Sequence, residues 1–166
     1  NIPNVVQKAF ISAEDHRFYS HPGIDLLAIL RAVKSNFIEG RIVSGASTLT
    51  QQLSRLTYPR KRTYYDKLVE LLRSLRIEWL LDKDQILELY LNRVPLGNNL
   101  VGVSAGSTTY FGKALSRLTS SEAALLASLP KAPGKLNPYG RNISSLLERK
   151  SWVLRKMHIN GHISSD

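Results

Sequence analysis

Apolar residues recur roughly every three to four positions along most of the chain, which is the spacing of one face of an α-helix. The clearest runs lie over residues 26–37 and 68–79, and no segment alternates apolar and polar residues as a half-buried strand would. The pattern therefore predicts an all-α protein. On the second run we expect the leucines to face inward, namely Leu68, Leu71, Leu72 and Leu75.

Helix starts are marked by residues whose side chains can cap a helix. Asp25 precedes the first run, and Thr119 is followed three residues later by Glu122, which is the spacing of a capping box. Asp82 and Gln85 have the same spacing. Prolines and glycines interrupt the pattern, most densely over residues 130–140, so we expect several helices separated by short loops.

Length and composition are those of a globular domain. The 166 residues are 43% hydrophobic and 22% charged, which excludes a disordered, collagen-like or polytopic membrane chain and fits one compact core. Cysteine is absent, so disulfides, a Cys-ligated zinc and a thiol nucleophile are excluded. The abrupt start at Asn1 leads us to expect a domain, residues 1–166, cut from a longer membrane-anchored protein.

The charge is strongly positive. Lys and Arg number 23 against 13 Asp and Glu, a formal net charge of +10. Such an excess favours a polyanionic partner or an anionic surface, and it leaves nucleic acid, a phosphorylated ligand and a membrane open.

Titratable residues are unusually dense over residues 14–23, where Glu14 and Asp15 precede two histidines and an arginine. A carboxylate beside Phe18 and Tyr19 would be partly desolvated and suited to act as a general base. On spacing alone, a solvated helix end with ordinary ion pairs is favoured over a catalytic site. The histidines lack metal-ligand spacing, so structural hydrogen bonding is the role expected of them.

Two further segments carry polar chemistry. Hydroxyl residues Ser47 and Thr48 precede a helical pattern, as in a site for an anion or a sugar, or in an ordinary N-cap. Beyond a basic loop at residues 60–62, Lys67, Glu70 and Arg73 share a helix face. That face is typical of a surface salt-bridge ladder, and also of a site that handles phosphates with or without a divalent metal.

Taken in order, these segments resemble the peptidoglycan glycosyltransferases, the lysozyme-like domain of class A penicillin-binding proteins and of monofunctional murein polymerases. Residues 14–23 match Glu-Asp-x-x-Phe-x-x-His-x-Gly, and residues 45–52 match Gly-Gly-Ser-Thr-hydrophobic-Thr-Gln-Gln except at Ala46. Residues 86–92 match Ile-Leu-Glu-x-Tyr-Leu-Asn completely. The resemblance covers nearly the whole chain and is strongest to the type 1C penicillin-binding proteins.

The chain departs from the family pattern Arg-Lys-x-x-Glu, because Asp66 stands where the family has Arg. Lys67 and Glu70 keep their places, and Arg62 matches a basic position near the donor's pyrophosphate. Arg55 stands where Lys is usual. The exchange at Asp66 puts one cationic contact of the family in doubt.

The resemblance implies polymerisation of lipid II into β-1,4-linked glycan strands, with inversion at the anomeric carbon and release of polyprenyl pyrophosphate. Glu14 would be the base that activates the acceptor hydroxyl. Glu70 would be a second catalytic carboxylate at the leaving group, holding cations or a divalent ion such as magnesium or manganese. The substrate-binding residues implied are Asp15, Phe18, His21, Ser47, Thr48, Gln51, Gln52, Arg55, Arg62 and Lys67.

A lipid-linked substrate implies work at the outer, periplasmic face of the bacterial cytoplasmic membrane. The partners expected are lipid II, the growing glycan strand and the membrane surface, with no nucleic acid. We expect a small lobe that associates with the membrane, and residues 33–43 are the candidate segment. The family's donor site also accepts phosphoglycolipid inhibitors of the moenomycin type.

Three alternatives remain open. A lysozyme-like hydrolase would share the fold, but it needs a protonated acid for a sugar leaving group, whereas the cations around Glu70 favour a phosphate. A degenerate domain that binds lipid II with weak or no polymerase activity is suggested by Asp66. A helical nucleic-acid-binding module would explain the charge, but the sequence has no recognition motif for one.

Overall fold

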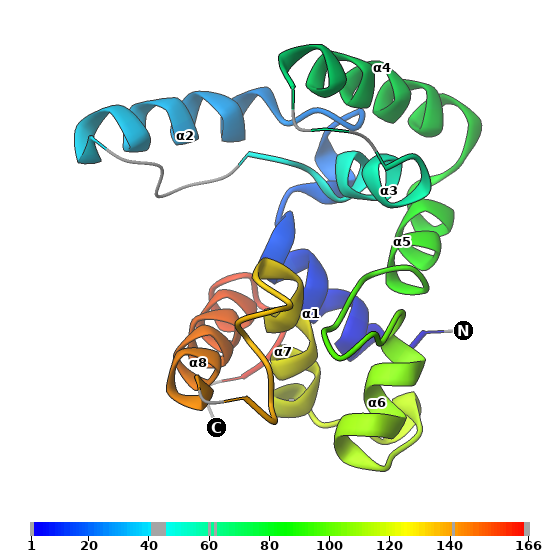
Figure 1. The fold of residues 1–166 in the computed structure, drawn as a ribbon, viewed down its shortest axis with the longest axis vertical. Coiled ribbons are helices and arrows are strands. Elements are labelled where there is room, and N and C mark those ends of the chain that lie inside the picture. Colours follow the sequence, from blue (N-terminus) through cyan, green and yellow to red (C-terminus); the bar gives the residue numbers. More distant parts are fainter. Residues whose placement is uncertain (1, 41–45, 60, 62, 141, 165–166) are drawn as a thin grey trace. The chain divides into compact units, whose positions relative to one another are not determined.

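The computed structural model describes residues 2–40, 46–59, 61, 63–140 and 142–164. As predicted, the chain is built from α-helices joined by short loops and 3₁₀ turns (Figure 1). Within the described ranges there is no strand, and the only β-type pairing is an isolated bridge between Pro95 and Val101.

The chain forms two compact units, a division that the hydrophobic pattern does not indicate. The first unit combines residues 1–16 with residues 87–166, and the second consists of residues 17–86. The first unit is therefore discontinuous in sequence, and the second is inserted into it.

Three helices form the centre of the first unit, namely α1 (Asn4–Glu14), α7 (Ser120–Ser128) and α8 (Ile143–Ile159). Each of the three packs against the other two, and α6 (Val103–Phe111) packs against α7. The core contains Phe10, edge-on to Tyr90, with Leu126 and Val153 fully buried nearby in the same unit. Burying such side chains stabilises a fold by about 1.5–3 kcal/mol each.

The second unit contains the 3₁₀ turn η1 (Phe18–Ser20), then α2 (Leu26–Glu39), α3 (Leu49–Thr57) and α4 (Tyr64–Leu80). Helix α3 packs along α4. The helix α5 (Lys83–Leu91) begins in this unit and ends in the first.

The predicted helix caps are confirmed. The Asp25 carboxylate accepts the Ala28 N–H at 2.7 Å at the start of α2. Thr119 and Glu122 form the expected capping box of α7. Asp82 and Gln85 exchange hydrogen bonds of 2.8 and 3.0 Å between side chain and backbone at the start of α5. These reciprocal bonds satisfy backbone N–H groups that the first turn of a helix leaves without partners.

The prediction that the α4 leucines face inward is wrong. Leu68 and Leu72 are more than half exposed, and the one buried residue of α4 is Ser74. The reason is that the polar side of α4, with Lys67 and Glu70, is the side in contact with α3 residues. Periodicity identified the helix correctly, but it could not show which face would meet the protein.

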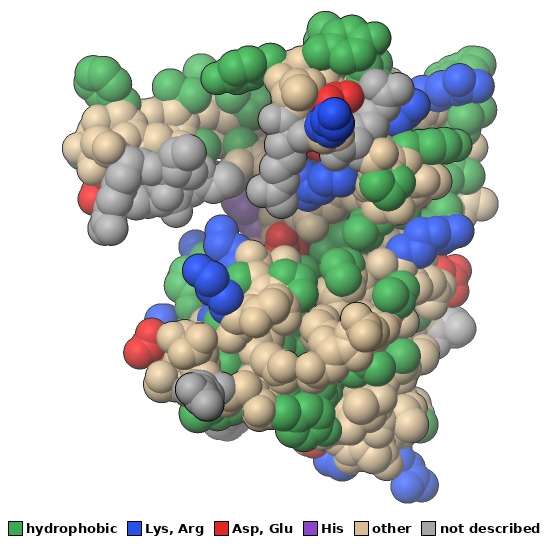
Figure 2. Space-filling view, viewed as in Figure 1, with side chains coloured by type: hydrophobic (Ala, Val, Ile, Leu, Met, Phe, Trp, Pro, Cys, Tyr) green, Lys and Arg blue, Asp and Glu red, His purple; other side chains and the backbone are tan. Residues whose placement is uncertain are grey.

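Helix α2 is also apolar on the outside. Its buried residues are only Ala28 and Ala32. Apart from Ile29, which is partly buried, the large apolar side chains of α2 are exposed, from 59% at Leu27 to 88% at Phe37. In the space-filling view, hydrophobic side chains gather over α2 and over α4 (Figure 2). Among the described residues, no helix combines the length and the hydropathy needed to cross a bilayer.

Gly23 packs against α4 so closely that no side chain fits. Its φ is +85°, and a Cβ there would lie 2.9 Å from the Glu78 Cγ and 3.1 Å from the Ser74 carbonyl oxygen. We expect Gly23→Ala to lower the free energy of unfolding of the second unit by about 1–3 kcal/mol, because both the backbone and the contact become strained. Thermal unfolding measures this. Gly40→Ala is the control, since Gly40 also has positive φ (+63°) but no atom lies within 4 Å of its Cβ position; equal losses would refute the packing argument.

Candidate active site

Two of the predicted acids lie at the end of α1 in the first unit. Glu14 is the last residue of the helix, and its side chain is 13% exposed. Its Oε1 lies 3.8 Å from Nη2 of Arg149 on α8. Asp15 is the C-cap, is buried, and donates its backbone N–H to the Ile11 carbonyl. Glu14 therefore combines partial burial with a small opening to solvent, as a general base requires.

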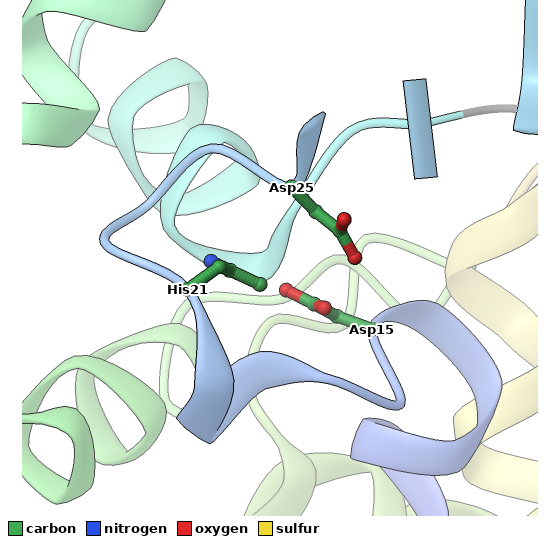
Figure 3. Close-up of side chains that lie close together, drawn as sticks. All are labelled: Asp15, His21 and Asp25. Carbon is green, nitrogen blue, oxygen red and sulfur yellow. The ribbon is translucent and has the colours of Figure 1, made fainter. Parts of the chain in front are cut away.

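The loop that follows belongs to the second unit and holds His21 and Asp25 (Figure 3). The buried His21 accepts the Gly23 N–H on its Nδ1 at 3.2 Å. Burial would raise the pKa of Asp25, but hydrogen bonds from Arg17 and from the Ala28 N–H hold it below the usual range. Asp25 is thus an ionised cap tied to Arg17, and both contacts keep the loop in place.

Phe18, which the resemblance assigns to substrate binding, has no exposed surface in this structure. Its ring is fully buried, packs edge-on against Tyr19 and His21, and carries the Lys83 ammonium 4.5 Å from its centre. A side chain in this position supports the loop.

Thr48 and Gln51 are likewise buried, and their side chains form hydrogen bonds with other parts of the chain. Thr48 caps α3 and donates its hydroxyl to the Gly23 carbonyl at 2.6 Å. Gln51 donates to the same carbonyl at 3.5 Å and accepts from Lys67 at 3.2 Å. In this structure, these contacts tie the loop before α2 to α3 and α4.

The motif residues of α3 and α4 converge on Glu70. The Lys67 ammonium donates to Glu70 Oε1 at 2.5 Å, and also to Ser47 Oγ and Gln51 Oε1, each at 3.2 Å. Arg55 lies 3.5 Å from the other Glu70 oxygen. The Glu70 side chain is 11% exposed, whereas those of Lys67 and Arg55 are about 40% exposed. The carboxylate thus fixes two cations that still face solvent, and we call Lys67, Glu70 and Arg55 the cationic cluster.

The remaining predicted residues are Gln52 and Arg62. Gln52 is half-buried on α3, and Arg62 lies outside the described residues. Asp66, which replaces the family's Arg, accepts the Thr63 hydroxyl at 2.6 Å, and Thr63 in turn accepts the Asp66 N–H. An acid in the first turn also interacts favourably with the positive end of the helix. The exchange therefore gives α4 a stable start.

Sequence reasoning missed the partly buried pair of Glu78 and Lys83. The Glu78 Oε1 accepts from Lys83 at 2.7 Å and from the Thr50 hydroxyl at 2.5 Å. Lys83 also donates to the His21 carbonyl at 2.6 Å. Nothing in their spacing signals this role, because the partners come from three separate segments.

Comparison with known proteins gives a consistent result. The sequence pattern described as "Transglycosylase" matches residues 1–158. Penicillin-binding protein 1A of Aquifex aeolicus is 46% identical over 99% of this chain and 23% of its own length. Penicillin-binding protein 1C of Escherichia coli is 46% identical over 93% of this chain and 20% of its own length.

A putative transglycosylase of Cupriavidus necator is 44% identical over 98% of this chain and 70% of its own length. The chain thus spans about a fifth of the penicillin-binding proteins it matches, but most of this shorter relative. Because the family pattern covers residues 1–158 of the 166, the chain belongs to the transglycosylase family.

Proposed function

We propose that the protein is an inverting peptidoglycan glycosyltransferase that polymerises lipid II into β-1,4-linked glycan strands and releases polyprenyl pyrophosphate. The observation that carries this proposal is the cationic cluster, in which Glu70 holds Lys67 and Arg55 within 3.5 Å. Such fixed, solvent-facing cations suit the charge that develops on a departing pyrophosphate.

The reaction needs a base at the acceptor. The 4-hydroxyl of the acceptor sugar loses its proton as it attacks the donor's anomeric carbon, and Glu14 is the group that we assign to accept this proton. The α-linked pyrophosphate leaves from the opposite face, so the product has the β configuration and no covalent glycosyl-enzyme forms. Glu14 has the ionisable oxygen and the partial exposure that the step requires.

The leaving group needs positive charge rather than an acid. Pyrophosphate departs as an anion, so Lys67 and Arg55 offset its charge without transferring a proton. Glu70 acts through them, since it accepts from one and pairs with the other. Among the described residues, the cations of this cluster are what distinguish the proposed transferase from a hydrolase, which would have to protonate a sugar oxygen.

A divalent ion fits this cluster poorly. Both Glu70 oxygens already face a cationic nitrogen. In the part of the chain that the structure describes, Glu70 belongs to no group of three side chains able to hold a metal. The contacts of Glu70 therefore do not support a resident metal ion bound to this carboxylate. Any magnesium or manganese would be held mainly by substrate phosphates.

We also propose that α2 and α4 dock on the outer face of the bacterial cytoplasmic membrane, where lipid II resides. Exposed large side chains support this, namely Leu26, Leu27, Leu30, Val33, Phe37 and Ile38 on α2, and Leu68, Leu72, Leu75, Trp79 and Leu80 on α4. An apolar surface on this scale is typical of an interface with a membrane or a partner. Residues 41–43 of the predicted segment lie outside the described residues.

Replacing Phe37 by Ser should weaken membrane binding about 10- to 100-fold, because an aromatic side chain that enters the acyl region contributes about 1.5–3 kcal/mol. Cosedimentation with phosphatidylglycerol-containing vesicles measures the partition coefficient. Ile159→Ser is the matched control, since Ile159 is 72% exposed but lies on α8 in the first unit. Equal weakening by both variants would argue against docking through α2.

The polymerisation test uses labelled lipid II. Formation of long glycan strands supports the transferase, whereas cleavage of preformed glycan without polymer would favour the hydrolase. Saturable lipid II binding with no turnover would favour the degenerate binding domain suggested by Asp66. Salt-sensitive duplex binding without lipid II turnover would favour a nucleic-acid partner.

A further inference from the structure

Arg149 occupies a core-facing position of α8. The buried residues of this helix are Leu146, Val153 and Met157, and Arg149 lies three positions after the first and four before the second. At that spacing it shares their face, which packs on α1 and α7 (Figure 1). Its side chain is accordingly only 19% exposed. An arginine is rarely buried to this degree unless it has partners.

Its partners are all at the end of α1 or on α8 itself. Nη2 donates to the Ala13 carbonyl at 3.2 Å and lies 3.8 Å from Glu14 Oε1. The guanidinium carbon stacks 3.9 Å from the centre of the Trp152 ring, one turn further along α8. The ring fixes the plane of the guanidinium, so the group that reaches Glu14 is preorganised.

The Ala13 carbonyl is one of the last four of α1, which lack partners inside the helix. Arg149 satisfies it and places a positive charge at the negative end of the helix dipole. Burial lowers the pKa of Arg149 and the neighbouring Glu14 raises it, but a guanidinium stays charged at any physiological pH. The carboxylate of Glu14 is therefore next to a permanent cation.

Several other charged groups on the packed elements have contacts of their own. On α8, Lys150 donates to Ser121 and Lys156 lies over the Trp152 ring. On α7, Glu122 pairs with Lys113. Asp15 and His16 follow Glu14 directly in the chain. Arg149 is the α8 cation that pairs with Glu14 in this structure.

We propose that Arg149 is a positioning residue for Glu14: it fixes the end of α1 from which Glu14 projects and keeps the carboxylate ionised for proton acceptance. This inference rests on the proposed function, in which Glu14 is the base. A simple structural role would stabilise the first unit without affecting the proton chemistry. The two roles differ in how the rate depends on pH.

The test is the pH profile of kcat/KM for lipid II polymerisation by the purified protein. A cation favours the charged form of a neighbouring carboxylate, so its removal raises the pKa of that carboxylate. Arg149→Gln should therefore move the acidic limb of the profile upward by about one pH unit. We also expect a roughly tenfold lower kcat at pH 7.5, because the end of α1 is less fixed. KM should change little.

Two variants separate the effects. Arg149→Lys keeps the charge but loses the planar fork, so its acidic limb should stay near that of the parent while its kcat falls. Lys150→Gln removes a positive charge from the adjacent position of α8, where the side chain contacts Ser121. This variant should leave both the acidic limb and kcat unchanged. The Lys variant also keeps the test decisive if the Gln variant fails to fold, because a limb that moves upward although the charge is kept contradicts the proposal.

The variant Glu14→Gln separates a failure of the proposed role of Arg149 from a failure of the proposed role of Glu14 as the base. If Glu14→Gln polymerises at the parental rate, the assignment of the base fails and the inference falls with it. If Glu14→Gln is inactive but folded Arg149→Gln keeps the parental acidic limb, the base stands and only the role of Arg149 is overturned. In the Glu14→Gln background, Arg149→Gln should have no further effect on residual turnover.

Discussion

Replacing Glu14 by Gln should reduce kcat for lipid II polymerisation by about 10²–10⁴-fold, which is the usual contribution of a positioned general base. Glutamine keeps the size and much of the hydrogen bonding of the side chain but cannot accept a proton at neutral pH. KM should remain close to that of the parent, because the lost interaction belongs to the transition state. Initial rates with fluorescent lipid II measure both constants.

Glu148→Gln is the matched control for this prediction. Glu148 is an exposed carboxylate on α8 of the same unit, so its loss changes the net charge equally without removing the proposed base. We expect the control to polymerise at the parental rate. Parental turnover by folded Glu14→Gln would mean that another group takes the proton, and the mechanism would have to be reassigned.

The sequence was sufficient for the elements and for contacts within a single helix. Capping residues such as Asp25 and Thr119 act on backbone groups within one helical turn, so they can be recognised without tertiary information. The family motifs likewise contain Lys67 and Glu70 at a spacing that places both on one helix face. Local rules therefore predicted these features correctly.

What could not be predicted depends on which surfaces meet. The α4 leucines have a normal helical period, but the α3 residues bind the polar face instead. A rule that places apolar residues inside assumes water outside, and this assumption does not hold for helices that dock on a membrane, as we propose for α2 and α4. The internal contacts of Phe18 and Gln51 could not be predicted either, because Lys83 and Lys67 reach them from other helices.

Replacing Lys67 by Met should lower kcat by about 10²–10³-fold, comparable to the loss of one preorganised donor from a transition-state site. Methionine retains the length of the side chain but removes the charge that Ser47, Gln51 and Glu70 hold in place. The effect should fall mainly on kcat, because charge on the pyrophosphate increases as the glycosidic bond breaks. Lys67→Arg should recover part of the rate, since it restores a cation of different shape.

Arg73→Met is the control that tests whether the position of the charge matters. Arg73 lies on α4 two turns beyond Lys67, and its guanidinium stacks 4.6 Å from the Tyr58 ring rather than on Glu70. Both variants lose one positive charge from the same helix, so a general electrostatic attraction for lipid II would weaken equally in both. A specific leaving-group role predicts a large loss for Lys67→Met alone, at equal thermal stability. Equal losses, confined to KM, would instead assign the cationic cluster to substrate capture.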